Sequence, residues 1–284
     1  MKRNEMWIAF DFELTAQAEH NLFGEAGRSE RGFRKLLAAL STRHHIGLPP
    51  DFFGYTDEGV PNPKGEATII MAYSRRGMRL VGIGTSACAL LYEKIGAIHA
   101  AMMTHANCII RLTERSGQHA ADFTPVAQPY YLKSLMLGSA KSGSFWIRAA
   151  DAVKAGSSWP VEADRMLPKM IGQHLLRQIV LLQREGDNAE GKVMQSLALA
   201  LSDVESWQTA GQAFGRRLGI RVHSVAGHTF AGVGGGAGRV VLKEIEFTMK
   251  AKFDGPWFLG RDRIEGNGEL MPATRQWIPA RAAA

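Results

Sequence analysis

Apolar and polar side chains follow two periods along the first 115 residues. A period of two predicts a half-buried strand, because successive side chains of a strand point to opposite faces. The clearest case is the run from Met6 to Leu14, in which Asp11 and Glu13 alternate with apolar residues. Strands are predicted from this pattern and from β-rich composition at Met6–Leu14, Ala67–Tyr73, Met78–Ile83 and Ala106–Leu112.

Two helices are predicted between these strands, from apolar side chains three or four residues apart. A loop is expected over His20–Arg28; the first helix begins after Ser29, a favourable N-cap, and ends near Arg43. The second helix is capped by Thr85 or Ser86. In order, the elements give β-α-β-β-α-β, the split βαβ order of the ferredoxin-like fold.

The second half has longer and less regular elements. Strands are predicted at Pro129–Leu137, Ser144–Ile147, Ile220–Phe230 and Arg239–Phe253, followed by a glycine-punctuated hairpin at Gly255–Leu270. Between them, about residues 161–218 have a helical pattern. We therefore predict an α+β protein with two ferredoxin-like (RRM-like βαββαβ) units. The first covers residues 1–120; the second, residues 121–284, is degenerate, with a helical insertion and glycine-rich loops.

Composition narrows the class of protein. Of the 284 residues, 45% are hydrophobic and 21% charged, which excludes a disordered chain. No apolar run is long enough to span a bilayer. Asp11 and Glu13 interrupt the apolar stretch that a signal peptide would need. Cys88 and Cys108 form no framework for disulfides or zinc. We expect a cytoplasmic protein with no membrane partner, no cofactor and no metal site.

The formal net charge is +7, which favours a polyanion such as nucleic acid as the partner. The alternative is an ordinary basic enzyme without a nucleic-acid role. The positive charges are spread along the chain, so any basic surface has to be assembled by folding.

The glycine-rich segment Gly232–Gly238 is not a nucleotide-binding fingerprint. It lacks the GK[ST] of a P-loop, and the segment after it has the pattern of a strand where a dinucleotide fold needs a helix. Two interpretations stay open. The segment is a hairpin connection, or its bare backbone approaches a phosphodiester while Arg239 binds the phosphate.

A second glycine-rich segment follows, reading Phe258-Leu-Gly260-Arg-Asp-Arg-Ile-Glu-Gly266-Asn-Gly268. It resembles the terminal hairpin GhGxxxxxGxG of the RAMP superfamily of CRISPR-associated proteins, with Phe258 at the first glycine position. With the expected fold and charge, the chain resembles a CRISPR precursor-RNA processing endoribonuclease, and the helical insertion resembles the type IV system's version. The resemblance implies binding of a CRISPR repeat RNA stem-loop and association with other CRISPR-associated effector subunits.

Such an enzyme needs neither a metal nor a protein nucleophile, because RNA supplies its own 2′-hydroxyl. Attack on the adjacent phosphate leaves a 2′,3′-cyclic phosphate and a 5′-hydroxyl. The protein has to move two protons and stabilise negative charge, which requires histidine, arginine or lysine near the RNA. In the resembling family, a general acid–base histidine often lies near the end of the first helix. We therefore predict Arg28, Arg43 and His44 as catalytic, while an ordinary solvated helix end remains the alternative.

Other basic residues are predicted to bind RNA. Some extend the first helix, some lie in the helical insertion, and the rest flank glycine-rich loops. They are Arg31, Arg34, Lys35, His45, Lys141, Arg177, Arg184, His223, His228, Arg239, Arg261 and Arg263. His99 and His105, at the end of the second helix, are interpreted as packing or capping groups.

Two alternatives to the nuclease remain. One is a non-catalytic RAMP subunit that binds and scaffolds guide RNA. The other is a hydrolase, since Ser139-Ala-Lys141-Ser142 contains a Ser–Lys pair and Gly84-Thr-Ser86-Ala-Cys88 resembles a nucleophile elbow. Cys88 stands where that elbow requires its second glycine, which argues against hydrolase chemistry.

Overall fold

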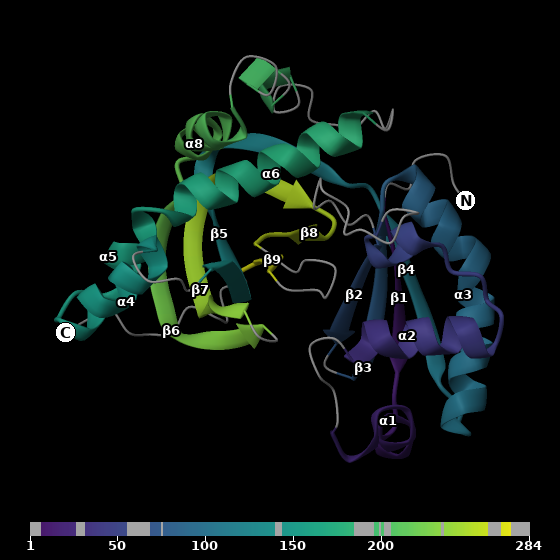
Figure 1. Cartoon of the computed structure of the whole chain (residues 1–284). Helices are drawn as coiled ribbons and strands as arrows, with labels where there is room; N and C mark the ends of the chain where they lie inside the picture. The colour runs from purple at the N-terminus through teal and green to yellow at the C-terminus, as the bar shows by residue number, and fades with distance from the viewer. Residues whose placement is uncertain are drawn as a thin grey trace. The chain divides into compact units, whose positions relative to one another are not determined.

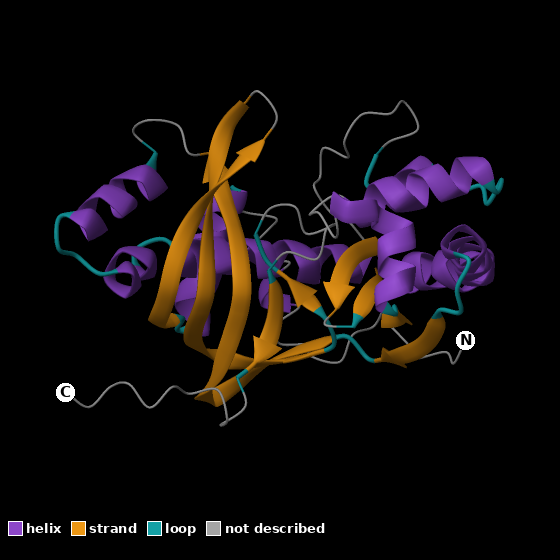
Figure 2. Ribbon diagram, turned by 90° about the horizontal axis from the view of Figure 1, so that it is seen from below, coloured by secondary structure: helices purple, strands orange, loops and turns teal. Residues whose placement is uncertain are grey.

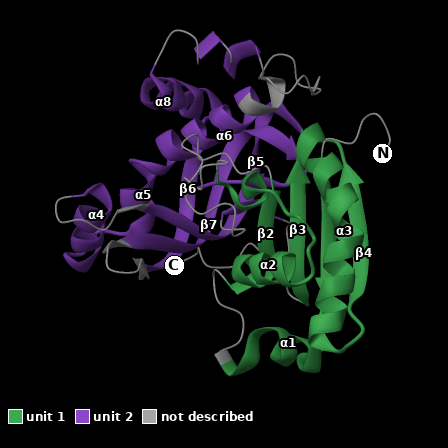
Figure 3. Ribbon diagram, turned by 45° about the vertical axis from the view of Figure 1, so that its right-hand side comes forward, with its two compact units in different colours: residues 1–119, 185–189, 263–266 green, residues 120–184, 190–262, 267–284 purple. Residues whose placement is uncertain are grey.

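The chain folds as two units, each with an antiparallel sheet and its own helices (Figures 1 and 3). The computed structural model describes residues 7–26, 32–55, 69–74, 76–139, 144–184, 196–198, 200–201, 206–233, 236–260 and 268–273. Described residues up to His119 belong to the first unit, and those from Ala120 onward belong to the second. The α+β class expected from the sequence is confirmed.

The first unit contains a four-stranded sheet in the order β2-β3-β1-β4. Its strands are β1 (Trp7–Glu13), β2 (Ile69–Ser74), β3 (Gly77–Ile83) and β4 (Arg111–Gly117), and every neighbouring pair is antiparallel. The helices are α1 (Ala16–Phe23), α2 (Gly32–Arg43) and α3 (Thr85–Ala106), with 3-10 turns η1 (Gly24–Ala26) and η2 (Pro50–Phe53).

The helices cover one face of this sheet (Figure 2). Alternation along β1 directs Phe10 and Phe12 into that core, where Phe12 meets Phe33 of α2 with ring centroids 6.4 Å apart. Leu91 and Ile98 of α3 complete the same cluster. The odd-numbered residues of β1 therefore lie on the opposite face.

Three boundaries predicted in this unit were wrong. His20 lies in α1, which Thr15 caps by accepting a hydrogen bond from the N–H of Ala18. Gly84, not Thr85 or Ser86, is the N-cap of α3, at a φ of 88° that favours glycine. The fourth strand begins at Arg111, because α3 continues to the fully buried Ala106. β4 is largely polar and exposed, so the alternation that marks a strand is missing from its sequence.

The second unit contains a five-stranded sheet in the order β6-β7-β5-β9-β8. Three of its strands are long and curved (Figure 2): β5 (Ala120–Ser139), β6 (Arg221–Val233) and β7 (Gly236–Asp254). The short strands β8 (Trp257–Phe258) and β9 (Glu269–Pro272) pair as the predicted hairpin. If the two-residue strand β8 is left out of the count, β6-β7-β5-β9 has the second-third-first-fourth order of the first sheet.

The helices of this unit are α4 (Phe145–Lys154), α5 (Trp159–Asp164), α6 (Leu167–Arg184) and α8 (Trp207–Leu218). The strand predicted at Ser144–Ile147 was wrong, since this segment starts α4 and buries Trp146 on the helix's inner face. The loop predicted at Gly232–Gly238 is also shorter than expected. Val233 pairs with Gly236, so most of the segment is strand, and only residues 234–235, outside the described residues, connect β6 to β7.

Two glycines of α8 allow close packing against α6. A Cβ atom on Gly215 would lie 2.2 Å from the carbonyl oxygen of Pro168, and one on Gly211 would lie 2.5 Å from the Cβ of Gln173. The Arg177 guanidinium carbon lies 5.3 Å from the centre of the Trp207 ring, which adds a cation–π contact between the helices. The backbones of α6 and α8 therefore pack directly against each other.

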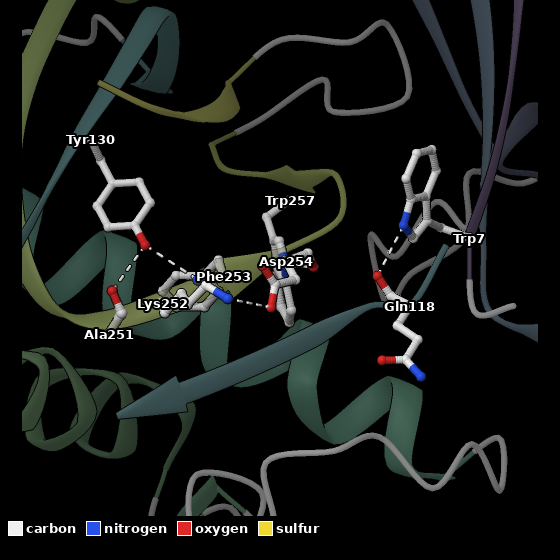
Figure 4. Close-up of polar contacts among 8 residues, drawn as sticks. All are labelled: Trp7, Gln118, Tyr130, Ala251, Lys252, Phe253, Asp254 and Trp257. Carbon is white, nitrogen blue, oxygen red and sulfur yellow. Dashed lines mark hydrogen bonds and ion pairs between the residues drawn. The ribbon is translucent and has the colours of Figure 1, made fainter. Parts of the chain in front are cut away.

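The hydroxyl of Tyr130 links β5 to β7 through two hydrogen bonds (Figure 4). It donates to the carbonyl of Ala251 at 2.9 Å and accepts from the N–H of Phe253 at 3.2 Å. Burial is the main reason that the pKa of Tyr130 is raised to about 12. Among the described helices, none is long and apolar enough to cross a membrane.

Candidate functional site

The last turns of α2 and α3 bring a predicted catalytic residue next to a histidine. Nη1 of Arg43 lies 3.2 Å from Nδ1 of His105. Arginine only donates hydrogen bonds, so Nδ1 accepts, and the ring proton of neutral His105 resides on Nε2. Sequence reasoning gave His105 a packing or capping role from its place at the end of the second helix, and it lies 62 positions from Arg43.

His44 directly follows α2 and is half-buried. Its Nε2 atom is buried and has no hydrogen-bond partner among the described residues. A buried polar atom without a partner is rare in folded proteins and calls for an explanation. His45, next in the chain, is exposed and has a φ of 53°, the left-handed conformation that ends many helices.

Two RNA-binding candidates on α2 differ in availability. The guanidinium of Arg34 donates to the carbonyl of Phe53 and lies 4.5 Å from the centre of the Tyr55 ring. It therefore holds the η2 segment against α2. Lys35 is exposed and can reach a ligand.

His99 of α3 was interpreted as a packing group. Its Nε2 contacts the carbonyl oxygen of Ile110 at 2.6 Å.

In the second unit, several candidates contact the protein itself. Arg177 lies against Trp207 as described above; Nε2 of His223 lies 2.9 Å from Oγ1 of Thr248; and Nη1 of Arg239 lies 3.5 Å from the sulfur of Met136. Arg184 ends α6, and its side chain lies outside the described part of the structure. His228 accepts a hydrogen bond from Nε1 of Trp159 at 3.1 Å. Five candidates of the two units lie outside the described residues: Arg28, Arg31, Lys141, Arg261 and Arg263.

A cluster of arginines on the first sheet was missed by sequence reasoning. Nε of Arg79 lies 2.7 Å from one carboxylate oxygen of Asp11, and Arg115 donates to the other oxygen at 2.7 and 3.0 Å. Glu13 lies 3.9 Å from Arg76 and 4.0 Å from Arg111. We call these six residues the arginine face, since β1 presents Asp11 and Glu13 on the face opposite the helices.

The arginine face sets four guanidinium groups against two carboxylates, an excess of two positive charges. Arg76 and Arg111 are 79% and 78% exposed, so a ligand can reach them. Trp7 ends the same face of β1, where its Nε1 donates to the carbonyl of Gln118 at 2.9 Å (Figure 4). Cationic and aromatic side chains on one sheet face are typical of surfaces that bind single-stranded nucleic acid.

The second glycine-rich segment, Phe258–Gly268, is held at its first residues by side chains of α6. The N–H of Gly260 donates to Nδ1 of His174 at 2.8 Å, and the Gln178 side chain donates to the carbonyl of Phe258 at 2.7 Å. Gly260 and Gly268 have positive φ, and a Cβ on Gly268 would lie 1.9 Å from the carbonyl oxygen of Leu259. Glycine is thus required at both ends of the segment that carries Arg261 and Arg263.

In the described part of the chain, no three His, Cys, Asp or Glu side chains are placed to hold a metal ion. Cys88 is buried and Cys108 half-buried, and both are free thiols.

Comparison with known proteins gives a matching family model and several matching structures. The family model of the type IV CRISPR-associated endonuclease Csf5 matches residues 28–275. A solved structure described as Csf5, a CRISPR-Cas type IV Cas6 crRNA endonuclease, has 15% identity and a TM-score of 0.57, covering 94% of this chain and 99% of that chain. A structure of Cas6b has 12% identity and a TM-score of 0.48, covering 94% and 98%. No curated protein matches. The structural match with the higher TM-score shows a shared fold.

Proposed function

Since the chain belongs to the family of the type IV CRISPR-associated endonuclease Csf5, we propose that it is a metal-independent endoribonuclease that cleaves CRISPR precursor RNA at repeat hairpins. The match of the family model to residues 28–275 carries this proposal. The product is mature crRNA, which the protein retains while it joins other CRISPR-associated subunits. Both units are ferredoxin-like in this proposal, and the second is the more degenerate.

The reaction proceeds by attack of a 2′-hydroxyl oxygen on the adjacent phosphorus. The bond from phosphorus to the 5′-oxygen breaks, so the products carry a 2′,3′-cyclic phosphate and a 5′-hydroxyl. One group removes the proton of the 2′-hydroxyl, and another donates a proton to the leaving oxygen. Acid–base help of this kind is worth roughly 10²–10⁴-fold in rate.

We assign these tasks to the end of α2. Arg43 and Arg28 stabilise the charge that develops on the phosphate, and His44 acts as the general acid or base. The contact between Arg43 and His105 supports this assignment, because a guanidinium held by a second side chain keeps its orientation. His105 is thus a positioning residue.

The RNA itself is held by other basic groups. In the first unit these are Lys35, His45 and the arginine face, and in the second they include Arg177, His223 and Arg239. A-form RNA is recognised largely through its shape, phosphates and 2′-hydroxyls, which suits cations placed on a sheet and on helices.

Cleavage of repeat RNA by the purified protein in EDTA tests the proposal. A matched RNA with a 2′-deoxyribose at the cleaved position serves as the control, because it lacks only the nucleophile. We expect the first RNA to be cut to a cyclic-phosphate product and the second to be bound uncut. Binding without cleavage of either RNA favours the scaffold alternative.

Variants separate chemistry from binding. Arg28→Ala, Arg43→Ala and His44→Ala should slow single-turnover cleavage by about 10²-fold or more and change affinity much less. Parent rates for all three would reject the assigned site. The salt dependence of affinity separates both RNA-binding functions from a metabolic enzyme, because phosphate contacts weaken steeply with salt.

A further inference from the structure

Two long strands of the second unit, β5 and β7, change their buried face at one row of residues. Along β7, Val240 and Leu242 are buried on one side of the row, and Ile245 and Phe247 on the other, so the parity of the buried positions shifts. Glu244 of β7 occupies the row. Along β5, Leu132 is buried before the row and Leu135 and Leu137 after it. The shift creates a crease across the sheet.

Glu244 has a left-handed backbone in the middle of a strand. Its φ is 50°, and the ladder pairs residues on either side of it with both neighbouring strands: Lys243 with Ser134 and Gly227, and Ile245 with Leu132 and Val225. A residue other than glycine pays roughly 1–2 kcal/mol for this conformation. Because glycine would relieve that strain, the presence of glutamate indicates a use for its carboxylate.

A pocket of about 410 Å³ lies at this crease, within the second unit. It is lined by Lys133, Ser134, Gly227, His228, Lys243 and Glu244. The volume falls in the range typical of sites for small molecules and single nucleotides.

The charged groups of the pocket are not neutralised by one another. Within the described residues, neither lysine ammonium group nor the Glu244 carboxylate takes part in an ion pair, and all three residues are exposed. Two positive charges therefore face one negative charge. A ligand that suits this pocket has an anionic group to pair with the two lysines and a hydrogen-bond donor to bind the Glu244 carboxylate.

His228 contributes a donor with a defined tautomer. Nε1 of Trp159 donates to its Nδ1 at 3.1 Å, and the two rings lie 4.8 Å apart. An acceptor Nδ1 places the ring proton of neutral His228 on Nε2. The buried Trp159 of α5 thus fixes the orientation of this histidine at the pocket wall.

We propose that this pocket binds one ribonucleotide, with its phosphate between Lys133 and Lys243 and a hydroxyl or amino group donating to Glu244. The proposal rests on the proposed function in taking the ribonucleotide to be part of the bound RNA. The same chemistry fits a free nucleoside monophosphate. The pocket lies within the second unit, and loss of its charges should weaken RNA binding.

The test compares Lys133→Ala and Lys243→Ala with Lys250→Ala, which removes an exposed lysine of β7 that does not line the pocket. We expect each pocket variant to bind repeat RNA about tenfold more weakly, which is the size of one lost charged hydrogen bond. The slope of log K against log salt should fall by about 0.7–0.9 for each lysine removed. Lys250→Ala should keep the parent affinity and the parent cleavage rate.

A second arm uses 5′-AMP and inorganic phosphate as probes, in calorimetry on the whole protein. If 5′-AMP binds the parent and not Lys243→Ala, the pocket accepts a free nucleotide; if only RNA affinity responds to the variants, its ligand is a nucleotide within the chain. Both results support the site. If the pocket variants match Lys250→Ala for RNA and for 5′-AMP, the proposal is overturned.

Glu244→Gly gives an independent measurement. Removal of the backbone strain should raise the melting temperature, while loss of the carboxylate should weaken ribonucleotide binding. Stabilisation with unchanged affinity would reject the role of Glu244. A parent protein that binds RNA through these lysines and never cuts it would leave the pocket standing and reject the nuclease.

Discussion

Arg43 donates a hydrogen bond to Nδ1 of His105 at 3.2 Å, and this contact joins the last turns of α2 and α3. It links a residue expected to stabilise negative charge to a histidine whose own sequence context gave no sign of function. The pair therefore offers a direct test of whether the end of α2 is the reactive part of the first unit.

We expect His105→Ala to slow cleavage roughly tenfold, because Arg43 loses the acceptor that orients it. His105→Asn, which retains an acceptor oxygen, should recover part of the rate. The double variant with Arg43→Ala should be no slower than Arg43→Ala alone, as residues that act through one another are not additive. Single-turnover rates at saturating RNA measure this, and additive losses would contradict the positioning role.

Asp11→Ala should destabilise the first unit by about 1–2 kcal/mol. Asp11 is only 17% exposed and accepts from two arginines at hydrogen-bond distance, so its loss leaves two guanidinium groups close together. Exposure of Arg115 to solvent keeps the loss below that of a fully buried pair. Glu13→Ala is the control, since its arginines lie at 3.9 and 4.0 Å and are highly exposed. Urea unfolding should show a change below about 0.5 kcal/mol for that control.

Gly215→Ala should destabilise the helical insertion by about 2 kcal/mol or more, because the new methyl group would overlap the carbonyl of Pro168. Gly96→Ala is the matched control. Gly96 lies inside α3 with no atom within 4 Å of a built Cβ, so alanine should stabilise by about 0.5–1 kcal/mol. Melting temperatures should therefore move in opposite directions. A tolerated Gly215→Ala would mean that the two helices are not in backbone contact.

Tyr130→Phe should cost about 1–2 kcal/mol at neutral pH, through the loss of the hydrogen bonds to Ala251 and Phe253. It should also change the response to alkali. The folded-state pKa of Tyr130 is about 12 against an ordinary value of 10.0, so its neutral form stabilises the fold fully below pH 10. Between pH 10 and 12 the parent should lose up to about 1.4 kcal/mol per pH unit from this group, because the unfolded state ionises first. Urea midpoints at pH 9 and 11 measure the difference, and equal losses in parent and variant would contradict it.

The sequence alone predicted most of the first unit, because the period of a strand or helix is a local property. Phe10 and Phe12 alternate with polar residues, and the apolar face of α2 repeats at helical spacing, so both elements were predicted within a few residues. The fourth strand was predicted too early in the chain because local periodicity was the only guide. An exposed, polar edge strand such as Arg111–Gly117 has no alternation to read.

The glycines of the second motif were also informative by themselves. Gly260 and Gly268 occupy positive φ at sites where a Cβ would strike the backbone, so the spacing records a steric requirement. Family membership followed from the same motif together with the order of the elements. The roles of Arg28, Arg31, Lys141, Arg261 and Arg263 stay predictions, since these residues lie outside the described part of the chain.

Only the tertiary structure decided which side chains meet. Alternation places Asp11 on the face opposite the helices but cannot tell that Arg79 and Arg115 lie within hydrogen-bond distance, because strand order and register are not local. The contact of Arg43 with His105 depends in the same way on how α2 packs against α3. The crease at Glu244 arises where β5 and β7 shift their buried face together, and no pattern within a single strand reveals its neighbours. Local chemistry therefore determined the elements and the kinds of residue available, and long-range packing determined the sites.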